Sequence, residues 1–400
     1  MRPNTEFYKV HSEPREENTL LSYLCALCVF AKRLRAPYLA GAIILGFAGT
    51  IAAQTSFLKS EKSLSANFHA GFVIPHRPVM RNLVTGHTKG FELTLEIATN
   101  GTQEWHKVYK NPSLALDLFA ASLGNPEQLG EQYHLLLGPI LPLNPGKKVR
   151  LTLHLGMGPG ISTKKWDLET NYQSTPIGST LNASILAQLG IQVPVTKNIN
   201  INAGARMSHL SNAAFKLPNL GTNIASIYFG AHFGERNETP IVENPATDHL
   251  SYASRNFSAS LKMGLREILP PGGVKYQMWS LTFGHDWRRT SKSAFGVFAD
   301  VMYNENLTPL LLSAGDKHVT NGDNVRLGIA GAYTIHFEQW HIKFMTGAYV
   351  RNEFKRDGSI YNRVALRYNF PKGLFFSLGM KTHLAVADHW EWGLGYSIPR

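Results

Sequence analysis

A histidine and a serine two positions apart, His209 and Ser211, have the side chains that nucleophilic catalysis requires. A serine hydroxyl is a weak nucleophile until a neighbouring imidazole accepts its proton, which makes the pair a candidate nucleophile and base. Asn223 follows as a candidate third member, because its side-chain oxygen can accept the other imidazole hydrogen and fix the tautomer. Polar residues at this spacing also commonly cap a loop, so the surrounding elements must decide between the two interpretations.

The pair ends a segment whose residues alternate in character. Apolar residues occupy every second position of 199–207, in phase with His209 and Ser211, whereas the positions between them are mostly polar. Residues two apart on a strand point to the same side, so we expect both side chains to face outward with the apolar set. If the hairpin that follows is symmetric about Lys216, Asn223 lies directly opposite His209.

This geometry predicts an active site with Ser211 as the nucleophile, His209 as the base and Asn223 as the group that orients the imidazole. The backbone amides after Ser211, together with the side chain of Asn212, are candidates to bind the oxyanion of a tetrahedral intermediate. A site that faces lipid suits an ester within the bilayer better than a soluble substrate.

The same alternation continues along most of the chain from about residue 65, and it is clearest in 150–157, 276–287, 294–303 and 326–337. Many segments reach the roughly 10 residues that cross a bilayer when tilted, and their other face is rich in small polar residues. A soluble sheet shows the same pattern, but in lipid only a closed barrel satisfies every backbone group. We therefore predict an all-β fold, a transmembrane antiparallel β-barrel of about 14 strands, with about 12 to 16 compatible with the pattern.

The first 54 residues differ from the rest of the chain. A basic cluster is followed by the apolar run 38–49 and then by small residues, which are the three parts of a secretory signal peptide. The run is at the short end for the alternative, a single membrane anchor. We expect an N-terminal extension and signal peptide in 1–54, with cleavage near Ala53 or Gln54, and assign 55–400 to the barrel.

The formal net charge of +12 suits an anionic partner. The leader holds six basic and four acidic residues, so about +10 remains on the exported part. An anionic lipid surface is the simpler partner, and charges that merely solvate the chain are the alternative. No nucleic-acid-binding motif is present, so we expect no nucleic-acid partner. Both cysteines, Cys25 and Cys28, lie in the leader, so the exported chain lacks thiols and disulfides.

The last residues of the sequence show the same alternation. Trp392, Leu394, Tyr396 and Ile398 share one face and are separated by small residues. This resembles the C-terminal signal that bacterial outer-membrane barrels show to their assembly machinery, although the final Pro399-Arg400 differs from the usual aromatic terminus. The resemblance implies the outer membrane of a Gram-negative bacterium as the location and that machinery as a partner, and it leaves the oligomeric state open.

Other chemically able residues are less promising. His285 and Asp286 are neighbours on a predicted strand, so their side chains should point to opposite faces. Asp167 and Glu169 offer carboxylates in a predicted loop that could approach the site. The remaining histidines show no metal-ligand spacing, and no phosphate-binding or dinucleotide motif is present, so we expect no metal and no cofactor.

The hairpin 199–234 resembles a known active site. His209-Leu210-Ser211-Asn212-Ala213 followed by Pro218-Asn219-Leu220-Gly221 is similar to that of the outer-membrane lipid A 3-O-deacylases, the PagL family, also described as acyloxyacyl hydrolases. The resemblance implies that His209 is the base and Ser211 the nucleophile, with Asn212 and the amide region near Ala214 as an oxyanion site. The family's third member is a glutamate where Asn223 stands, and its barrel of eight strands accounts for about half of this chain.

Outer-membrane phospholipase A is similar in a different respect. It too has His-x-Ser-Asn, and its third member is an asparagine at the spacing of Asn223. The leading hypothesis is a serine esterase that removes an ester-linked acyl chain from lipid A of lipopolysaccharide. A phospholipase A is the rival enzyme, and a non-catalytic barrel, either a pore or a structural protein, is the rival from another class.

Overall fold

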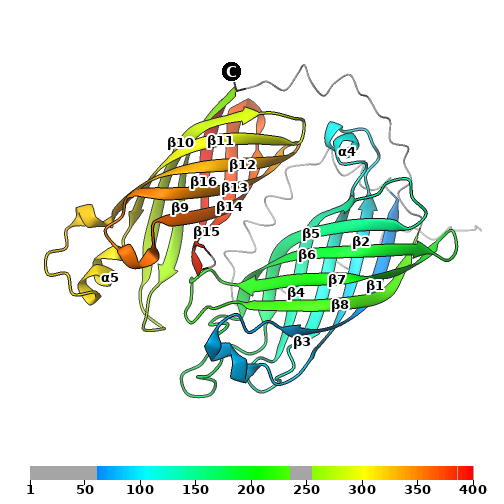
Figure 1. Ribbon diagram of the computed structural model, residues 1–400, viewed down its shortest axis with the longest axis horizontal. Coiled ribbons are helices and arrows are strands. Elements are labelled where there is room, and N and C mark those ends of the chain that lie inside the picture. The colour runs from blue at the N-terminus through cyan, green and yellow to red at the C-terminus, as the bar shows by residue number, and fades with distance from the viewer. Residues whose placement is uncertain (1–60, 235–254, 385, 400) are drawn as a thin grey trace, which may run out of the picture. The chain divides into compact units, whose positions relative to one another are not determined.

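The computed structural model describes residues 61–234, 255–384 and 386–399. The predicted signal peptide, its cleavage site and both cysteines lie outside the described residues. The described chain is built from antiparallel strands, each neighbour following the last in sequence (Figure 1).

The first barrel is a closed ring of eight strands, in which β1 pairs with both β2 and β8. Its strands are β1 (Lys62–Val73), β2 (Thr88–Ala98), β3 (Ser113–Ser122), β4 (Glu131–Pro142), β5 (Arg150–Ser162), β6 (Leu181–Pro194), β7 (Ile199–Ser211) and β8 (Thr222–Phe233). A 3-10 turn, η2 (Pro78–Leu83), lies between β1 and β2, and a short helix, α4 (Glu104–Val108), lies between β2 and β3.

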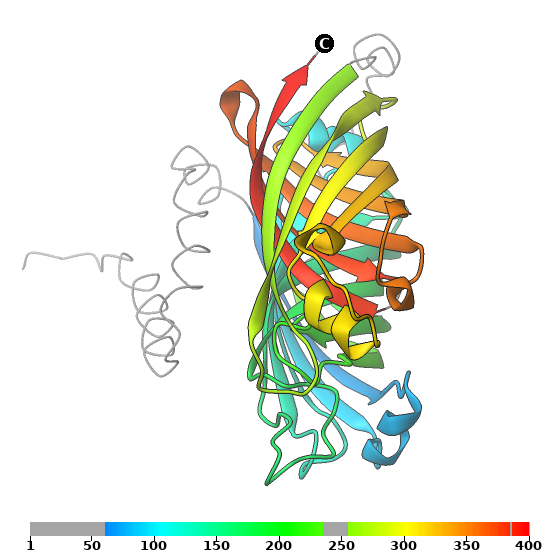
Figure 2. The same cartoon turned by 90° about the vertical axis from the view of Figure 1, so that its left-hand side faces the viewer.

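The second barrel is also a closed ring of eight strands, and β9 and β16 run side by side to close it (Figure 2). Its strands are β9 (Arg255–Glu267), β10 (Lys275–Arg288), β11 (Ser293–Asn304), β12 (Val325–Phe337), β13 (Trp340–Arg351), β14 (Ile360–Asn369), β15 (Leu374–His383) and β16 (Val386–Pro399). Its connections contain α5 (Leu307–Ser313), η4 (Asn321–Asn324), η5 (Lys355–Asp357) and η6 (Pro371–Gly373).

The predicted fold class is therefore confirmed, whereas the expectation of one barrel is wrong. The chain forms two separate barrels of eight strands, and their total of 16 lies at the upper end of the predicted range. Alternation specifies which face of a strand is buried, but not which strand closes the ring. Closure is set by the register of β1 on β8 and of β9 on β16, which the local pattern does not encode.

Each strand of the first barrel turns polar residues inward and apolar residues outward. On β1, Asn67 is 2% exposed and its neighbour Phe68 is 71% exposed; on β8, Ser226 is 7% exposed and Ile227 is 69% exposed. The interior of an eight-stranded barrel is just wide enough for side chains to fill. The apolar outer surface is the face that such a barrel presents to hydrocarbon.

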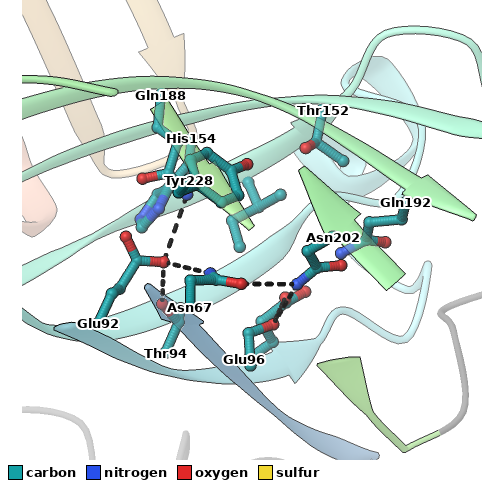
Figure 3. A pocket seen from close by; sticks show the side chains of 12 residues that line it. Asn67, Glu92, Thr94, Glu96, Thr152, His154, Gln188, Gln192, Asn202 and Tyr228 are labelled. Carbon is teal, nitrogen blue, oxygen red and sulfur yellow. Dashed lines mark hydrogen bonds between the residues drawn. The ribbon is translucent and has the colours of Figure 1, made fainter. Parts of the chain in front are cut away.

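Hydrogen-bonded charges fill the interior of the first barrel. The Arg206 guanidinium donates to Glu92 Oε2 at 2.6 Å and to Asp117 Oδ2 at 3.1 Å. Glu92 also accepts hydrogen bonds from Asn67, Thr94 and Gln188, as Figure 3 shows. The cavity beside these residues has a volume of about 20 Å³, enough for one water molecule and far too small for a pore.

The second barrel has a similar cluster. Arg363 contacts Asp300 at 2.6 Å and Glu391 at 2.8 Å, and all three side chains are at most 3% exposed. Tyr361 donates to the other oxygen of Asp300 at 2.5 Å. In each barrel, two buried carboxylates therefore pair with one buried arginine. Within the described residues, no helix is both long and apolar enough to cross a membrane.

Candidate active site

The hairpin of β7 and β8 positions the three predicted site residues. Antiparallel pairing aligns His209 with Asn223, which confirms the register predicted from symmetry about Lys216. His209 and Ser211 occupy the positions of β7 whose side chains point outward. Ser211 is nevertheless only 4% exposed, because it lies at the end of the strand, where the connection 212–221 begins. The site thus lies at the end of the strands, where the apolar surface meets a loop.

Asn223 holds the imidazole of His209. The Nδ1 atom of His209 lies 2.7 Å from Asn223 Oδ1, so Nδ1 carries the hydrogen and donates it, which leaves Nε2 available as a base. Gly221 packs against the same ring in a left-handed conformation, at φ +77°. A Cβ at this glycine would lie 2.6 Å from His209 Cε1, so any side chain there would displace the imidazole.

Two donors converge on the hydroxyl of Ser211. Asn219 Nδ2 donates to Ser211 Oγ at 2.9 Å, and the backbone amide of Ala213 donates to it at 3.1 Å. Among the described residues, no hydrogen bond joins Ser211 Oγ to His209. Transfer of the serine proton to His209 would therefore require the hydroxyl to turn from Asn219 toward the imidazole.

Asn212 organises the loop. Its Nδ2 donates to Ser179 Oγ at 2.7 Å and to the Lys216 carbonyl at 2.9 Å, and its Oδ1 accepts from the Lys216 amide. The backbone amide of Asn212 donates to Asn219 Oδ1 at 3.0 Å. Of the two side-chain hydrogens predicted to bind an oxyanion, one thus joins the hairpin to the β5–β6 connection and the other stays within the hairpin loop.

Ala213 and Ala214 have left-handed backbone conformations, at φ +51° and +59°. This conformation turns the chain sharply after Ser211 and directs the Ala213 amide back to the hydroxyl. Glycine is common in such conformations because an L side chain is strained there. No hydrogen bond within the described residues uses the Ala214 amide, which leaves that group open to the predicted oxyanion role.

His76 and Asn219 are site residues that the sequence reasoning missed. The ring of His76 contacts Asn223 Nδ2 through Nδ1 at 3.1 Å and the Leu220 carbonyl through Nε2 at 3.0 Å. Met80 and Leu83 of η2 are buried with Val73 at the end of the barrel, which anchors the segment that carries His76. Asn219 is part of the Pro218–Gly221 motif that carries the family resemblance. Parity along a strand does not describe a turn, so it gave no role for this side chain.

An apolar hollow of about 800 Å³ runs along the outer face of the first barrel beside the site. Its lining is mostly apolar and includes several small side chains. The residues are Ala70, Gly71, Phe72, Leu153, Ala187, Leu189, Ala205, Met207, Ala225 and Ile227, with His87 and the edges of Gln188, Arg206 and Ser226. Met207 and Ala225 pair with each other and lie two positions from His209 and Asn223 on the same face. The hollow thus ends within one residue pair of His209 and Asn223 along these strands.

The other candidates do not join this site. Asp167 accepts hydrogen bonds from the Thr170 amide and hydroxyl, and these bonds lower the pKa of its carboxyl in the β5–β6 connection. His285 stacks on Trp287 on the outer face, whereas Asp286 pairs with Lys343 at 2.7 Å inside, which confirms the predicted opposite orientations. No group of three His, Cys, Asp or Glu in the described chain could hold a metal ion.

The interior of the first barrel holds a second serine with a histidine and an acid. His69 Nδ1 lies 3.1 Å from Ser226 Oγ, and its Nε2 lies 3.1 Å from Glu92 Oε2. All three residues are less than 8% exposed and packed among the charges of Arg206 and Asp117. The three side chains are buried inside the barrel, so we assign the arrangement to the packing of the interior.

Comparison with known proteins agrees with this architecture. The family model described as lipid A 3-O-deacylase (PagL) matches residues 89–232, within the first barrel. The model described as acyloxyacyl hydrolase, C-terminal domain (PagL_C) matches residues 254–400, which span the second barrel. A comparison with curated protein sequences finds no match. The fold and these matches define the class of protein, an outer-membrane β-barrel of a hydrolase family. The chain belongs to the lipid A 3-O-deacylase (PagL) family.

Solved structures similar to the chain include outer-membrane proteins of low identity. CdiB from Acinetobacter baumannii is 8% identical with a TM-score of 0.18, and the match covers 86% of this chain and 60% of CdiB. A mutant of the Rh. blastica porin is 8% identical with a TM-score of 0.18, covering 84% of this chain and 99% of the porin. The outer membrane protein opdK from Pseudomonas aeruginosa is 11% identical with a TM-score of 0.20, covering 86% and 100%. Likenesses this weak carry no information about the activity.

Proposed function

We propose that this protein is a serine esterase of the outer membrane that removes an ester-linked acyl chain from lipid A. The observation that carries the proposal is the His209–Asn223 pair beside Ser211, on an outward face that continues into an apolar hollow. Family membership supports deacylation of lipid A, and the site geometry supports Ser211 as the nucleophile and His209 as the base.

The reaction begins when Ser211 Oγ gives its proton to His209 Nε2 and attacks the ester carbonyl. The tetrahedral intermediate carries a negative oxygen, for which the Ala213 amide and Asn219 Nδ2 lie close by and the Ala214 amide is open. The intermediate collapses as His209 returns the proton to the departing alcohol oxygen. Water then attacks the acyl-serine with His209 again accepting a proton, and the fatty acid leaves.

The substrate is proposed from the surroundings of the site. The hollow near His209 can accommodate an acyl chain, because nearly all of its lining is apolar. Arg77 follows His76 directly in the chain, and Lys216 lies in the loop that Asn212 holds, so two positive charges belong to the connections that form the site. A lipid with an anionic headgroup fits both features, and lipid A is the anionic ester that the family description names.

A comparison of lipids from cells that express the wild type and Ser211→Ala tests this proposal. We expect lipid A lacking one acyl chain from the wild type and intact lipid A from the variant, as measured by mass spectrometry. Lysophospholipid in place of the shortened lipid A would establish the rival phospholipase A. Identical lipid profiles in both strains would overturn the enzyme assignment and leave a non-catalytic barrel. If that barrel were a pore, its interior would have to be open, whereas the interior of the first barrel is filled by side chains.

A further inference from the structure

The amide of Asn223 can face His209 in two different orientations, whereas a carboxylate at this position would present an oxygen in either one. A carboxylate offers an acceptor oxygen on either side, whereas the amide of Asn223 has one acceptor and one donor end. With Oδ1 toward His209, the imidazole carries its hydrogen on Nδ1, and Nε2 is free to accept the Ser211 proton. With the amide turned over, Nδ2 would donate to Nδ1, the hydrogen would move to Nε2, and the base would be lost.

The contacts of His76 select between these two orientations. His76 Nε2 lies 3.0 Å from the Leu220 carbonyl, an acceptor, so this nitrogen carries the ring hydrogen of the neutral imidazole. Nδ1 is then the acceptor, and it lies 3.1 Å from Asn223 Nδ2. A third contact, 3.3 Å from Nδ1 to the Ile74 carbonyl, is longer than both and would require the opposite tautomer.

We propose that His76 is a positioning residue of the active site, which fixes the amide of Asn223 and through it the tautomer of His209. The inference rests on the proposed function, since it concerns the base of the same reaction. The relay runs from the Leu220 carbonyl through His76 and Asn223 to His209, with each donor facing an acceptor. His76 thus determines which end of the Asn223 amide faces His209. A carboxylate in place of this amide would not need such a partner.

A purely structural role for His76 is the competing explanation. The segment that carries His76 is also tied to β8 by a backbone hydrogen bond from Ile74 N to Asn223 O at 2.8 Å. Met80 and Leu83 anchor the same segment by burial. Neither attachment uses the His76 side chain, so its removal should leave the backbone in place and change only the amide.

The test compares the effect of His76→Ala in two backgrounds of the full-length protein. In the wild-type background we expect kcat to fall about tenfold or more, with KM within about twofold, because ground-state lipid contacts are unchanged. In the Asn223→Asp background we expect the same change to cost less than about threefold, because a carboxylate has no orientation to fix. His318→Ala, an exposed histidine of the second barrel, is the matched control.

A second measurement reads the tautomer without turnover. In ¹⁵N spectra of the detergent-solubilised protein, assigned by comparison with His209→Gln, the wild type should show the Nδ1–H form of His209. His76→Ala should show a mixture that includes the Nε2–H form.

An equal loss of kcat from His76→Ala in both backgrounds, or an unchanged His209 tautomer, would overturn the inference and leave the proposed function intact. Activity that persists in Ser211→Ala would instead overturn the proposed function. Should Asn223→Asp itself prove inactive, the spectra alone decide.

Discussion

At the scale of single residues, the proposed nucleophile Ser211 accepts hydrogen bonds that the His209-x-Ser211 motif does not predict. Asn219 spans the turn: its Nδ2 donates to Ser211 Oγ and its Oδ1 accepts from the Asn212 amide. The first contact places a donor beside the attacking oxygen, close to where the carbonyl oxygen of a bound ester would become negatively charged. The second fixes which end of the Asn219 amide faces the serine, since the Asn212 amide can bond only to the oxygen.

We therefore expect Asn219→Ala to lower kcat by about 10- to 100-fold, somewhat less than the loss known for a buried oxyanion donor, because the Ala213 amide remains. Asn219→Asp keeps the acceptor for Asn212 but puts a negative charge beside Ser211, so its activity should be lower still. The measurement is initial-rate kinetics on a lipid A substrate in detergent. Activity of Asn219→Asp above that of Asn219→Ala would contradict the donor role.

Ala214 gives a prediction about stability at the same scale. Its φ of +59° strains an L residue by about 1–2 kcal/mol, and glycine would relieve this. Glycine also costs about 0.5–1 kcal/mol in chain entropy and forfeits a buried methyl worth about 0.8 kcal/mol. These effects nearly cancel, so Ala214→Gly should change the free energy of unfolding by less than about 1 kcal/mol, whereas the β-branched Ala214→Val should lose more. Urea unfolding followed by tryptophan fluorescence distinguishes the two variants.

At the scale of elements, the small side chains of β6, β7 and β8 shape the hollow next to the site. Ala225 pairs with Met207 directly below His209 and Asn223, so a leucine there would fill the path proposed for the acyl chain. We expect Ala225→Leu to raise KM for long-chain esters several-fold while sparing short-chain esters. Ala231→Leu, on the same face of β8 but outside the hollow, is the control. Equal effects of both substitutions on long and short esters would count against the hollow.

Much of the arrangement of these elements follows from their local sequence. Alternation assigns His209 and Ser211 to the outer face, and the short connection after Ser211 places Asn223 opposite His209. His76 could not be found in this way, because it lies 147 residues from Asn223 and meets it only when β1 closes on β8. Ring closure also decides whether the strands form one barrel or two. It depends on pairing between the first and last strand of each ring, which the local sequence does not reveal. The turn that aims Asn219 depends on left-handed residues at Ala213 and Ala214, which side-chain parity does not reveal.

At the scale of the whole molecule, each barrel contains a buried arginine that pairs with two buried carboxylates. Arg206→Met would leave Glu92 and Asp117 without their cation, and breaking a buried pair in this way costs about 3–5 kcal/mol. We expect the variant to lose its heat-modifiable migration on gels at a lower urea concentration than the wild type. Arg77→Met, an exposed arginine of the same barrel, should shift the free energy of unfolding by less than about 0.5 kcal/mol. Comparable losses from both substitutions would show that the interior pairing is not what stabilises the ring.

Because each ring closes on itself, neither leaves an open strand edge for the other to cover. Every side chain assigned to the site belongs to the first barrel: His76, Ser179, His209, Ser211, Asn212, Asn219 and Asn223. A fragment of residues 61–234, exported behind a signal peptide, should therefore migrate as a heat-modifiable barrel and hydrolyse lipid A in a Ser211-dependent manner. The matched fragment 255–400 should fold but release no fatty acid. If fragment 61–234 folds and is inactive while the full chain is active, the second barrel takes part in catalysis or in delivery of the lipid. The prediction that the first barrel alone carries the activity would then be wrong.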